Sequence, residues 1–131
     1  MASSKSSLQS PLGKAKGHGA GKEGVHHWWH QKLTAVALIP LTIWFITLVV
    51  KAVQSDYSGF IALISEPINS ITMILFIVFS FYHAVLGMQV VIEDYITCPV
   101  AKYCSLIAVK LGGFVLGVAA VFSVCKIAFI A

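Results

Sequence analysis

The amino-acid sequence predicts an all-α integral membrane protein with three transmembrane helices. Hydrophobic residues make up 58% of its 131 residues and charged residues only 11%, and the mean hydropathy is +0.88, whereas soluble domains are typically about 45 to 50% apolar. The chain also contains three long, predominantly apolar runs. Each is near or beyond the roughly 20 residues that a helix needs to cross the hydrocarbon layer, and each is too long for the strand of a membrane β-barrel.

A polar tail comes first, and the apolar runs follow it. Residues 1–24 are rich in Ser, Gly and Lys and offer little to bury, so we expect a flexible tail there and a membrane anchor over residues 25–131. Pro40 predicts a mild kink in the first helix, whereas Pro67 suits the first turn of the second. Gly113 and Gly117 form a GxxxG that should let another helix of the same bundle approach closely. The predicted helices cover about 33–53, 68–92 and 104–130.

The distribution of charge predicts how the helices are oriented. Five lysines and one glutamate precede the first apolar run, whereas the loop between the first two runs carries one lysine and two acidic residues. Positive charge is retained on the cytoplasmic or matrix side, so the N-terminus is expected there and the C-terminus on the opposite side. The lysine excess is thus an orientation signal rather than a nucleic-acid footprint. Tryptophans and tyrosines should form an aromatic belt at the inner interface, namely Trp28, Trp29, Tyr95 and Tyr103.

A histidine lies within the second apolar run, in the stretch FYHAVLGMQVVIEDY. Asp94 follows His83 by eleven residues, and eleven steps of about 100° place both side chains on one helix face, about 16 Å apart along the axis. Gly87 lies on the same face, one turn from the imidazole. Three uses of His83 remain open on this pattern alone: a hydrogen bond to a neighbouring helix, axial ligation of a haem iron beside the gap at Gly87, or a proton relay.

Two motifs resemble the small hydrophobic membrane anchors of succinate dehydrogenase, the D-type cytochrome b subunits of respiratory complex II. HAVLGMQVVIEDY, residues 83–95, has the family's His, a Gly four residues on, and an Asp-Tyr pair after eleven. GVHHWWHQKLTAVALIPL, residues 24–41, is similar to the start of the family's first helix. The resemblance covers about residues 24–131. It implies half of a haem-binding helical bundle that a second, C-type anchor subunit completes.

The resemblance also implies roles for residues on the second helix. His83 would be an axial ligand of the iron of haem b, with Gly87 making room and the second ligand supplied by the partner anchor. Tyr95 matches the tyrosine whose hydroxyl donates to a ubiquinone carbonyl oxygen, a role that suits a phenol in an apolar belt. Asp94 beside it would tune the quinone site or pass protons.

Ahead of the first helix, His26 and Lys32 fall where the family uses His and Arg near the haem propionates and the quinone site. The sequence departs from the family at Lys32, because an ammonium keeps the charge of Arg but loses its bidentate geometry.

The sequence contains no nucleotide-binding loop, iron–sulfur cysteine cluster or flavin motif, so succinate oxidation must belong to partner subunits. The resemblance implies that the chain docks an extrinsic flavoprotein and an iron–sulfur subunit, shares haem b with the second anchor and helps to bind ubiquinone. It would do so in a bacterial cytoplasmic (inner) membrane or a mitochondrial inner membrane. The alternative is a three-helix proton-relay, structural or transport subunit without haem.

Overall fold

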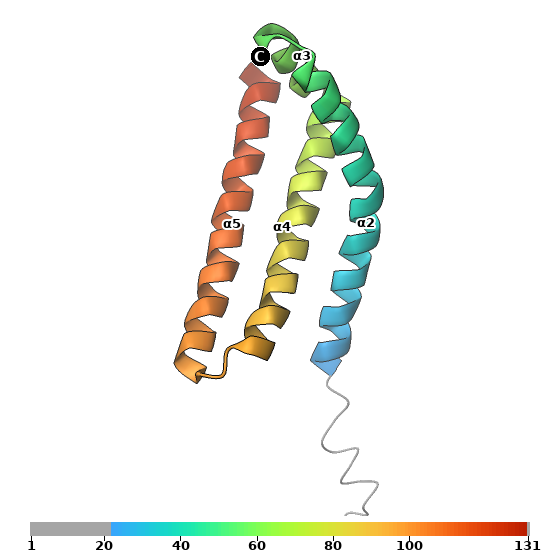
Figure 1. Ribbon diagram of the computed structural model, residues 1–131. Helices are drawn as coiled ribbons and strands as arrows, with labels where there is room; N and C mark the ends of the chain where they lie inside the picture. Colours follow the sequence, from blue (N-terminus) through green and yellow to red (C-terminus); the bar gives the residue numbers. More distant parts are fainter. Residues whose placement is uncertain (1–21, 131) are drawn as a thin grey trace, which may run out of the picture.

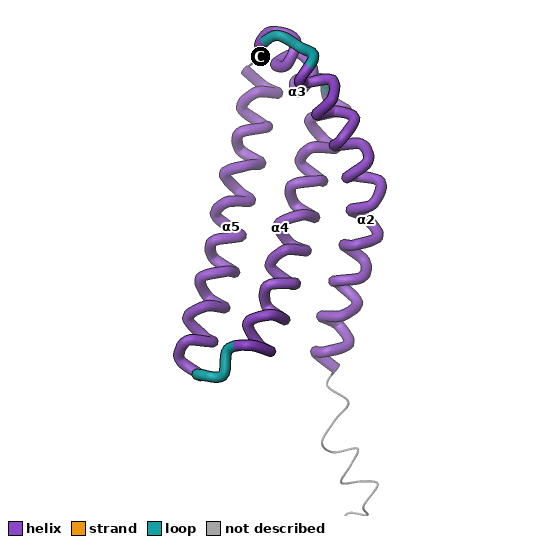
Figure 2. The backbone as a smooth tube through the Cα atoms, in the orientation of Figure 1, coloured by secondary structure: helices purple, strands orange, loops and turns teal. Residues whose placement is uncertain are grey.

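The computed structural model describes residues 22–130, and this part of the chain consists of helices joined by short loops, without strands (Figures 1 and 2). Helices α2, α4 and α5 are each long and apolar enough to cross a membrane. The predicted all-α, multi-pass membrane protein is therefore confirmed. Residues 1–21 of the predicted tail lie outside the described part. The helices are α2 (Lys22–Val53), α3 (Tyr57–Ser65), α4 (Pro67–Tyr95) and α5 (Pro99–Ile130).

The three long helices lie side by side in a row, with α4 in the middle (Figure 1). α4 packs against α2 on one side and against α5 on the other. Within residues 22–130, no Cα atom of α2 comes within 8 Å of a Cα atom of α5. Only 6 to 11% of the residues in the most apolar window of each long helix are buried. The chain is therefore an open layer, as expected for part of a larger bundle.

The helices extend beyond the apolar runs that predict them. α2 begins at Lys22 rather than at about Leu33, and its helical backbone continues through Pro40 while the helix bends along its length (Figure 1). Apolar composition marks only the hydrocarbon span, whereas a helix that satisfies its own backbone groups can continue into the interface. Proline removes one hydrogen bond of the helical ladder, which accounts for a bend without a break.

Helix α3 is a short element that the sequence analysis missed. The carboxylate of Asp56 caps it by accepting a hydrogen bond from the backbone N–H of Gly59 at 2.8 Å and another from the Ser58 hydroxyl at 2.9 Å. The pKa of Asp56 lies below its usual value, mainly because of the hydrogen bond from the Gly59 N–H and secondly because of the bond from the Ser58 hydroxyl. α3 lies across the ends of the long helices, at the end of the helix layer opposite the α4–α5 turn (Figure 1).

The best-packed part of the chain lies at this α3 end. Leu48 of α2, Ile64 of α3 and Val124 of α5 form one buried apolar cluster. The hydroxyl of the buried Ser70 donates to the Ile64 carbonyl at 2.6 Å, and the Ser65 hydroxyl, which donates to the Ile61 carbonyl of its own helix at 2.7 Å, lies 3.4 Å from the Ile127 carbonyl of α5. These contacts fasten α3 to the start of α4 and to the end of α5.

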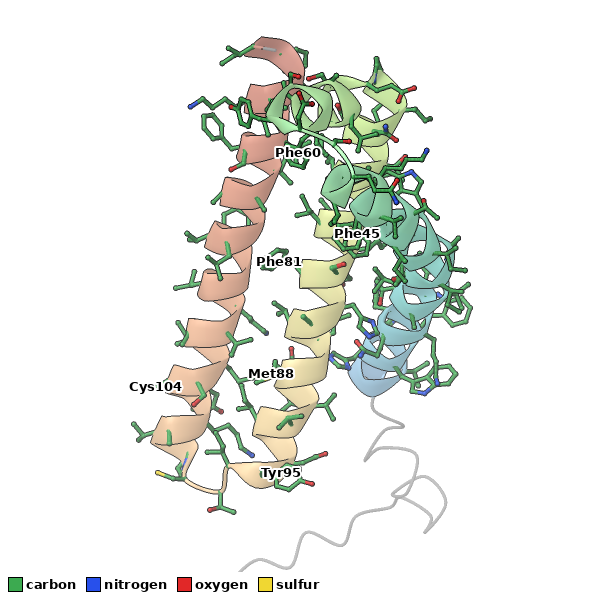
Figure 3. The ribbon with its side chains drawn as sticks, turned by 45° about the horizontal axis from the view of Figure 1, so that its top comes forward. Phe45, Phe60, Phe81, Met88, Tyr95 and Cys104 are labelled. Atoms are coloured by element: carbon green, nitrogen blue, oxygen red, sulfur yellow. The ribbon has the colours of Figure 1, made fainter. Side chains whose placement is uncertain are left out.

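Small residues set the contact between α4 and α5. A Cβ atom added at Gly113 would overlap the side chain of Val85, and one added at Gly117 would touch the ring of Phe81 at 3.7 Å. Figure 3 shows Phe81 between the two helices. The expectation that the GxxxG serves packing within the chain is confirmed. An apolar groove of about 660 Å³ runs along this contact, with Lys110 and Tyr82 among its lining residues.

Candidate functional site

The intramembrane imidazole of His83 lies at the contact between α4 and α2. The side chain is half-buried, and both of its nitrogens face α2. The Thr34 hydroxyl oxygen lies 2.9 Å from Nδ1 of His83, and the amide nitrogen of Gln31 lies 3.5 Å from Nε2. Because 3.5 Å is long for a hydrogen bond, the imidazole is held firmly at Nδ1 and only weakly approached at Nε2.

Gly87 lies beside the same contact, as the spacing predicts. A Cβ atom added there would have one neighbour within 4 Å, the amide nitrogen of Gln31 at 3.5 Å, which is an ordinary van der Waals contact. The structure therefore brings His83 and Gly87 together on the side of α4 that faces α2. The space that Gly87 leaves is bordered by the end of one flexible side chain and not by backbone.

Three polar residues of α2 were missed by the sequence analysis. His27, Gln31 and Thr34 follow one another at i, i+4 and i+7, so they lie on one stripe of the helix. Thr34 is only 3% exposed, and His27 Nε2 and Gln31 Oε1 are buried atoms without a hydrogen-bond partner in the structure. The spacing of these three residues was the signal available in the sequence, because polar side chains at this period on an apolar helix mark a face that meets polar groups.

The predicted quinone residues lie at the far end of α4 from α3. Tyr95 is the last residue of the helix and is 82% exposed, and Asp94 is also exposed. In Figure 3 the labelled Tyr95 lies at the end of α4, next to the turn into α5. That turn is held by Lys102, whose ammonium donates to the Glu93 carbonyl at 2.9 Å. The structure does not bring Asp94 or Tyr95 into contact with the imidazole of His83.

His26 and Lys32 lie on other faces of α2. Both are exposed, and the Lys32 ammonium lies over the Trp28 ring, 5.8 Å from its centroid. At about 100° per residue, Lys32 is about 100° and His26 about 140° around the helix from Gln31. Within residues 22–130 the structure therefore brings neither of them to His83.

The donor set around His83 limits the kind of metal site that the chain could build. Within residues 22–130 no group of three or more His, Cys, Asp and Glu side chains is placed to hold a metal ion. His83 could supply one ligand, so a metal ion bound there would need its other ligands from a prosthetic group or another chain. An iron porphyrin is a group of this kind, since the ring supplies four nitrogens and leaves the axial positions to protein side chains.

The fold and this contact define a class of protein: a multi-pass membrane protein whose middle long helix turns a half-buried histidine toward a neighbouring helix. The sequence matches the family of succinate dehydrogenase/fumarate reductase transmembrane subunits over residues 6–123, and the chain belongs to that family. No solved structure matches the chain significantly.

Curated relatives narrow the class to the hydrophobic membrane anchor subunits of succinate dehydrogenase. The protein of that name from Rickettsia bellii is 40% identical over 104 residues, which cover 79% of this chain and 83% of the relative. The anchor subunit of Rickettsia typhi is 36% identical, covering 75% of this chain and 78% of the relative, and that of Paracoccus denitrificans is 28% identical, covering 89% and 90%. The resemblance drawn from the two sequence motifs is confirmed.

Proposed function

We propose that this chain anchors a succinate dehydrogenase in the membrane, supplies one axial ligand to a haem b shared with a second anchor subunit, and forms part of the ubiquinone site. The observation that carries the haem assignment is the state of the His83 imidazole. It is half-buried, bonded through Nδ1, and approached at Nε2 only by the end of a flexible side chain. A ligating histidine needs this arrangement, because one nitrogen must be free for the iron.

Two features beside His83 support a flat macrocycle there. Gly87 lacks a side chain one turn from the imidazole, and the nearest group on α2 is the amide end of the flexible Gln31 side chain rather than backbone. The second axial ligand is assigned to the partner anchor, as the resemblance to the succinate dehydrogenase anchors implies. When bound, haem b supplies a one-electron redox centre whose potential depends on its axial ligands and their hydrogen bonds.

The ubiquinone site is assigned to Tyr95 and Asp94. The phenol of Tyr95 is exposed at the end of α4, so its hydroxyl is free to donate to a quinone carbonyl oxygen while its ring stays in the interface. The Asp94 carboxylate beside it can pass protons to the reduced quinone. Because both side chains are exposed in this chain, partner subunits must complete the pocket.

The end of the helix layer at which Tyr95 lies is also assigned to docking. The start of α2 and the α4–α5 turn lie at one end (Figure 1), and that end carries the exposed Trp28, Trp29, Tyr95 and Tyr103. Together with the lysine asymmetry, this supports a proposed N-terminus on the cytoplasmic or matrix side, where the extrinsic iron–sulfur and flavoprotein subunits would dock. His26 and Lys32 lie at this end and are assigned to the surroundings of the haem propionates. The membrane is a bacterial cytoplasmic or mitochondrial inner membrane.

The haem assignment is tested by His83→Ala in the purified complex. Loss of one strong-field ligand should shift or bleach the low-spin visible spectrum. Enzymatic succinate oxidation with a soluble dye as electron acceptor bypasses the membrane site and should be retained. His30→Ala is the matched control, since His30 packs edge-on against Tyr82, with 6.1 Å between ring centroids, and has no assigned role. An unchanged low-spin spectrum in His83→Ala would refute the ligand. A complex without any haem spectrum would favour the proton-relay alternative.

The quinone assignment is tested by Tyr95→Phe, which keeps the ring and removes the hydroxyl. Loss of one hydrogen bond, neutral or to a charged oxygen, costs roughly 0.5 to 3 kcal/mol, so quinone reduction should fall about 2- to 150-fold, with assembly and haem unchanged. Tyr103→Phe is the control, because Tyr103 is an exposed aromatic at the same end of the chain. Quinone reduction at the wild-type rate in Tyr95→Phe would return this residue to the aromatic belt.

A further inference from the structure

Thr34 is the residue that fixes the position of the His83 ring. Its side chain is 3% exposed, and its hydroxyl oxygen has three close partners: the His30 carbonyl at 2.8 Å, the Gln31 carbonyl at 3.1 Å, and Nδ1 of His83 at 2.9 Å. The first two contacts are with the preceding turn of its own helix. Only the third reaches another helix.

Counting protons over these contacts favours one tautomer of His83. A hydroxyl has one proton to donate, and a carbonyl oxygen can only accept. If that proton went to Nδ1, two carbonyl oxygens would lie 2.8 and 3.1 Å from the hydroxyl oxygen with no proton between them. The favourable arrangement is the usual one for a helical threonine, whose hydroxyl donates back to the i−4 carbonyl. The hydroxyl oxygen then accepts a hydrogen bond from Nδ1–H of His83.

We infer that Thr34 is a positioning residue that holds His83 in the tautomer with the proton on Nδ1 and the lone pair on Nε2, and so presents Nε2 to the haem iron. The reason for holding this tautomer rests on the proposed haem function, whereas the contact between Thr34 and His83 does not depend on it. The Nε2 lone pair points toward the amide end of Gln31, the group that borders the space at Gly87. An acceptor on the nitrogen opposite the metal fixes the ring orientation and raises the basicity of the ligand.

The first test requires no haem. The full chain, labelled with ¹⁵N-histidine in lipid nanodiscs, should show one tautomer of His83 with the proton on Nδ1, and the signal is assigned by its loss in His83→Ala. Thr34→Val removes the hydroxyl at nearly constant shape and should give a mixture of tautomers, whereas Thr34→Ser should keep the wild-type signal. Thr47→Val is the matched control, because Thr47 donates to the Trp44 carbonyl on the same helix and is exposed.

The second test uses the assembled complex. Loss of an outer hydrogen-bond partner of a ligating histidine typically costs about 10- to 100-fold in metal binding, so Thr34→Val should release haem to apomyoglobin faster by about that factor. Thr34→Ser and Thr47→Val should release it at the wild-type rate.

The outcomes separate this inference from the haem assignment. A wild-type His83 with its proton on Nε2, or a Thr34→Val chain that keeps the wild-type tautomer, overturns the role of Thr34. The first of these needs no variant and so does not depend on whether Thr34→Val folds. If instead His83→Ala keeps the low-spin spectrum, the haem assignment fails, and the tautomer measurement still decides what Thr34 does.

Discussion

The two sides of α4 are built on different principles. Toward α5, the contact is apolar and close, because Gly113 and Gly117 admit the side chains of Val85 and Phe81. Toward α2, part of the contact is polar, and its α2 side includes two buried atoms that have no partner in the structure.

The α2–α4 contact itself changes along its length. Phe45 stacks on Phe76 with ring centroids 4.4 Å apart, so the part of the contact nearer α3 is aromatic. The polar contacts of His83 belong to the other part, nearer the start of α2. Buried polar atoms without partners cost stability, and a chain that only needed to join two helices would not retain them. The α5 side of α4 is thus built for close helix packing, whereas the His83 side keeps buried polar atoms that helix packing does not need.

The largest expected effect is at Gly113. Gly113→Ala places a methyl group on Val85, and overpacking of this kind costs about 1 to 3 kcal/mol of unfolding free energy, which should lower the thermal stability and yield of the complex. Gly112→Ala is the matched control, because a Cβ atom there has no neighbour within 4 Å. Val85→Ala combined with Gly113→Ala should recover part of the loss. Equal stability of the two glycine variants would break the comparison.

The next effect is at Gly87, where helix packing and haem binding should respond differently to the same substitution. Gly87→Ala meets only the movable Gln31 amide, so the stability of the helix pair should stay the same or rise by up to about 1 kcal/mol, as for glycine replacement in a helix. The same methyl group would lie against a bound macrocycle. Overpacking there by about 1 to 3 kcal/mol predicts haem release about 5- to 150-fold faster, measured by transfer to apomyoglobin. Wild-type haem release in this variant would remove Gly87 from the haem site.

The smallest expected effect is at Gln31. Gln31→Leu removes a 3.5 Å contact and a buried carbonyl oxygen without a partner, so the unfolding free energy of the haem-free chain should change by less than about 1 kcal/mol, toward greater stability. Denaturation of the full chain in detergent micelles measures this change. A clear destabilisation would mean that the polar contact has a structural purpose, and the contrast between the two sides of α4 would be lost.

The sequence predicts the helices better than it predicts their contacts. Apolar runs of sufficient length identify α2, α4 and α5, because only a helix can satisfy backbone groups in lipid over such a length. α3 was missed because the whole helix is only nine residues long and resembles a loop between spans, although Asp56, Ser58 and Gly59 form a recognisable cap. The residues of a short interfacial helix are not distinguished by hydropathy.

The site was predicted in part for a similar reason. Helical periodicity places His83 and Gly87 on one face of α4, and the structure agrees. It does not tell which face of α2 lies opposite, since that depends on long-range packing. His26 and Lys32 were therefore predicted from their likeness to a family motif, whereas the structure turns Gln31 and Thr34 toward His83.

The position of the buried cluster has a consequence for how the protein is made. Leu48, Ile64 and Val124 join α2, α3 and α5 at one end of the chain, whereas α2 meets His83 in the part nearer the opposite end. Parting α2 from α4 at that opposite end would break side-chain contacts but leave the cluster intact, so it would be a local rather than a global opening. Under the proposed function, such an opening would admit the haem after membrane insertion and closure of the α3 end.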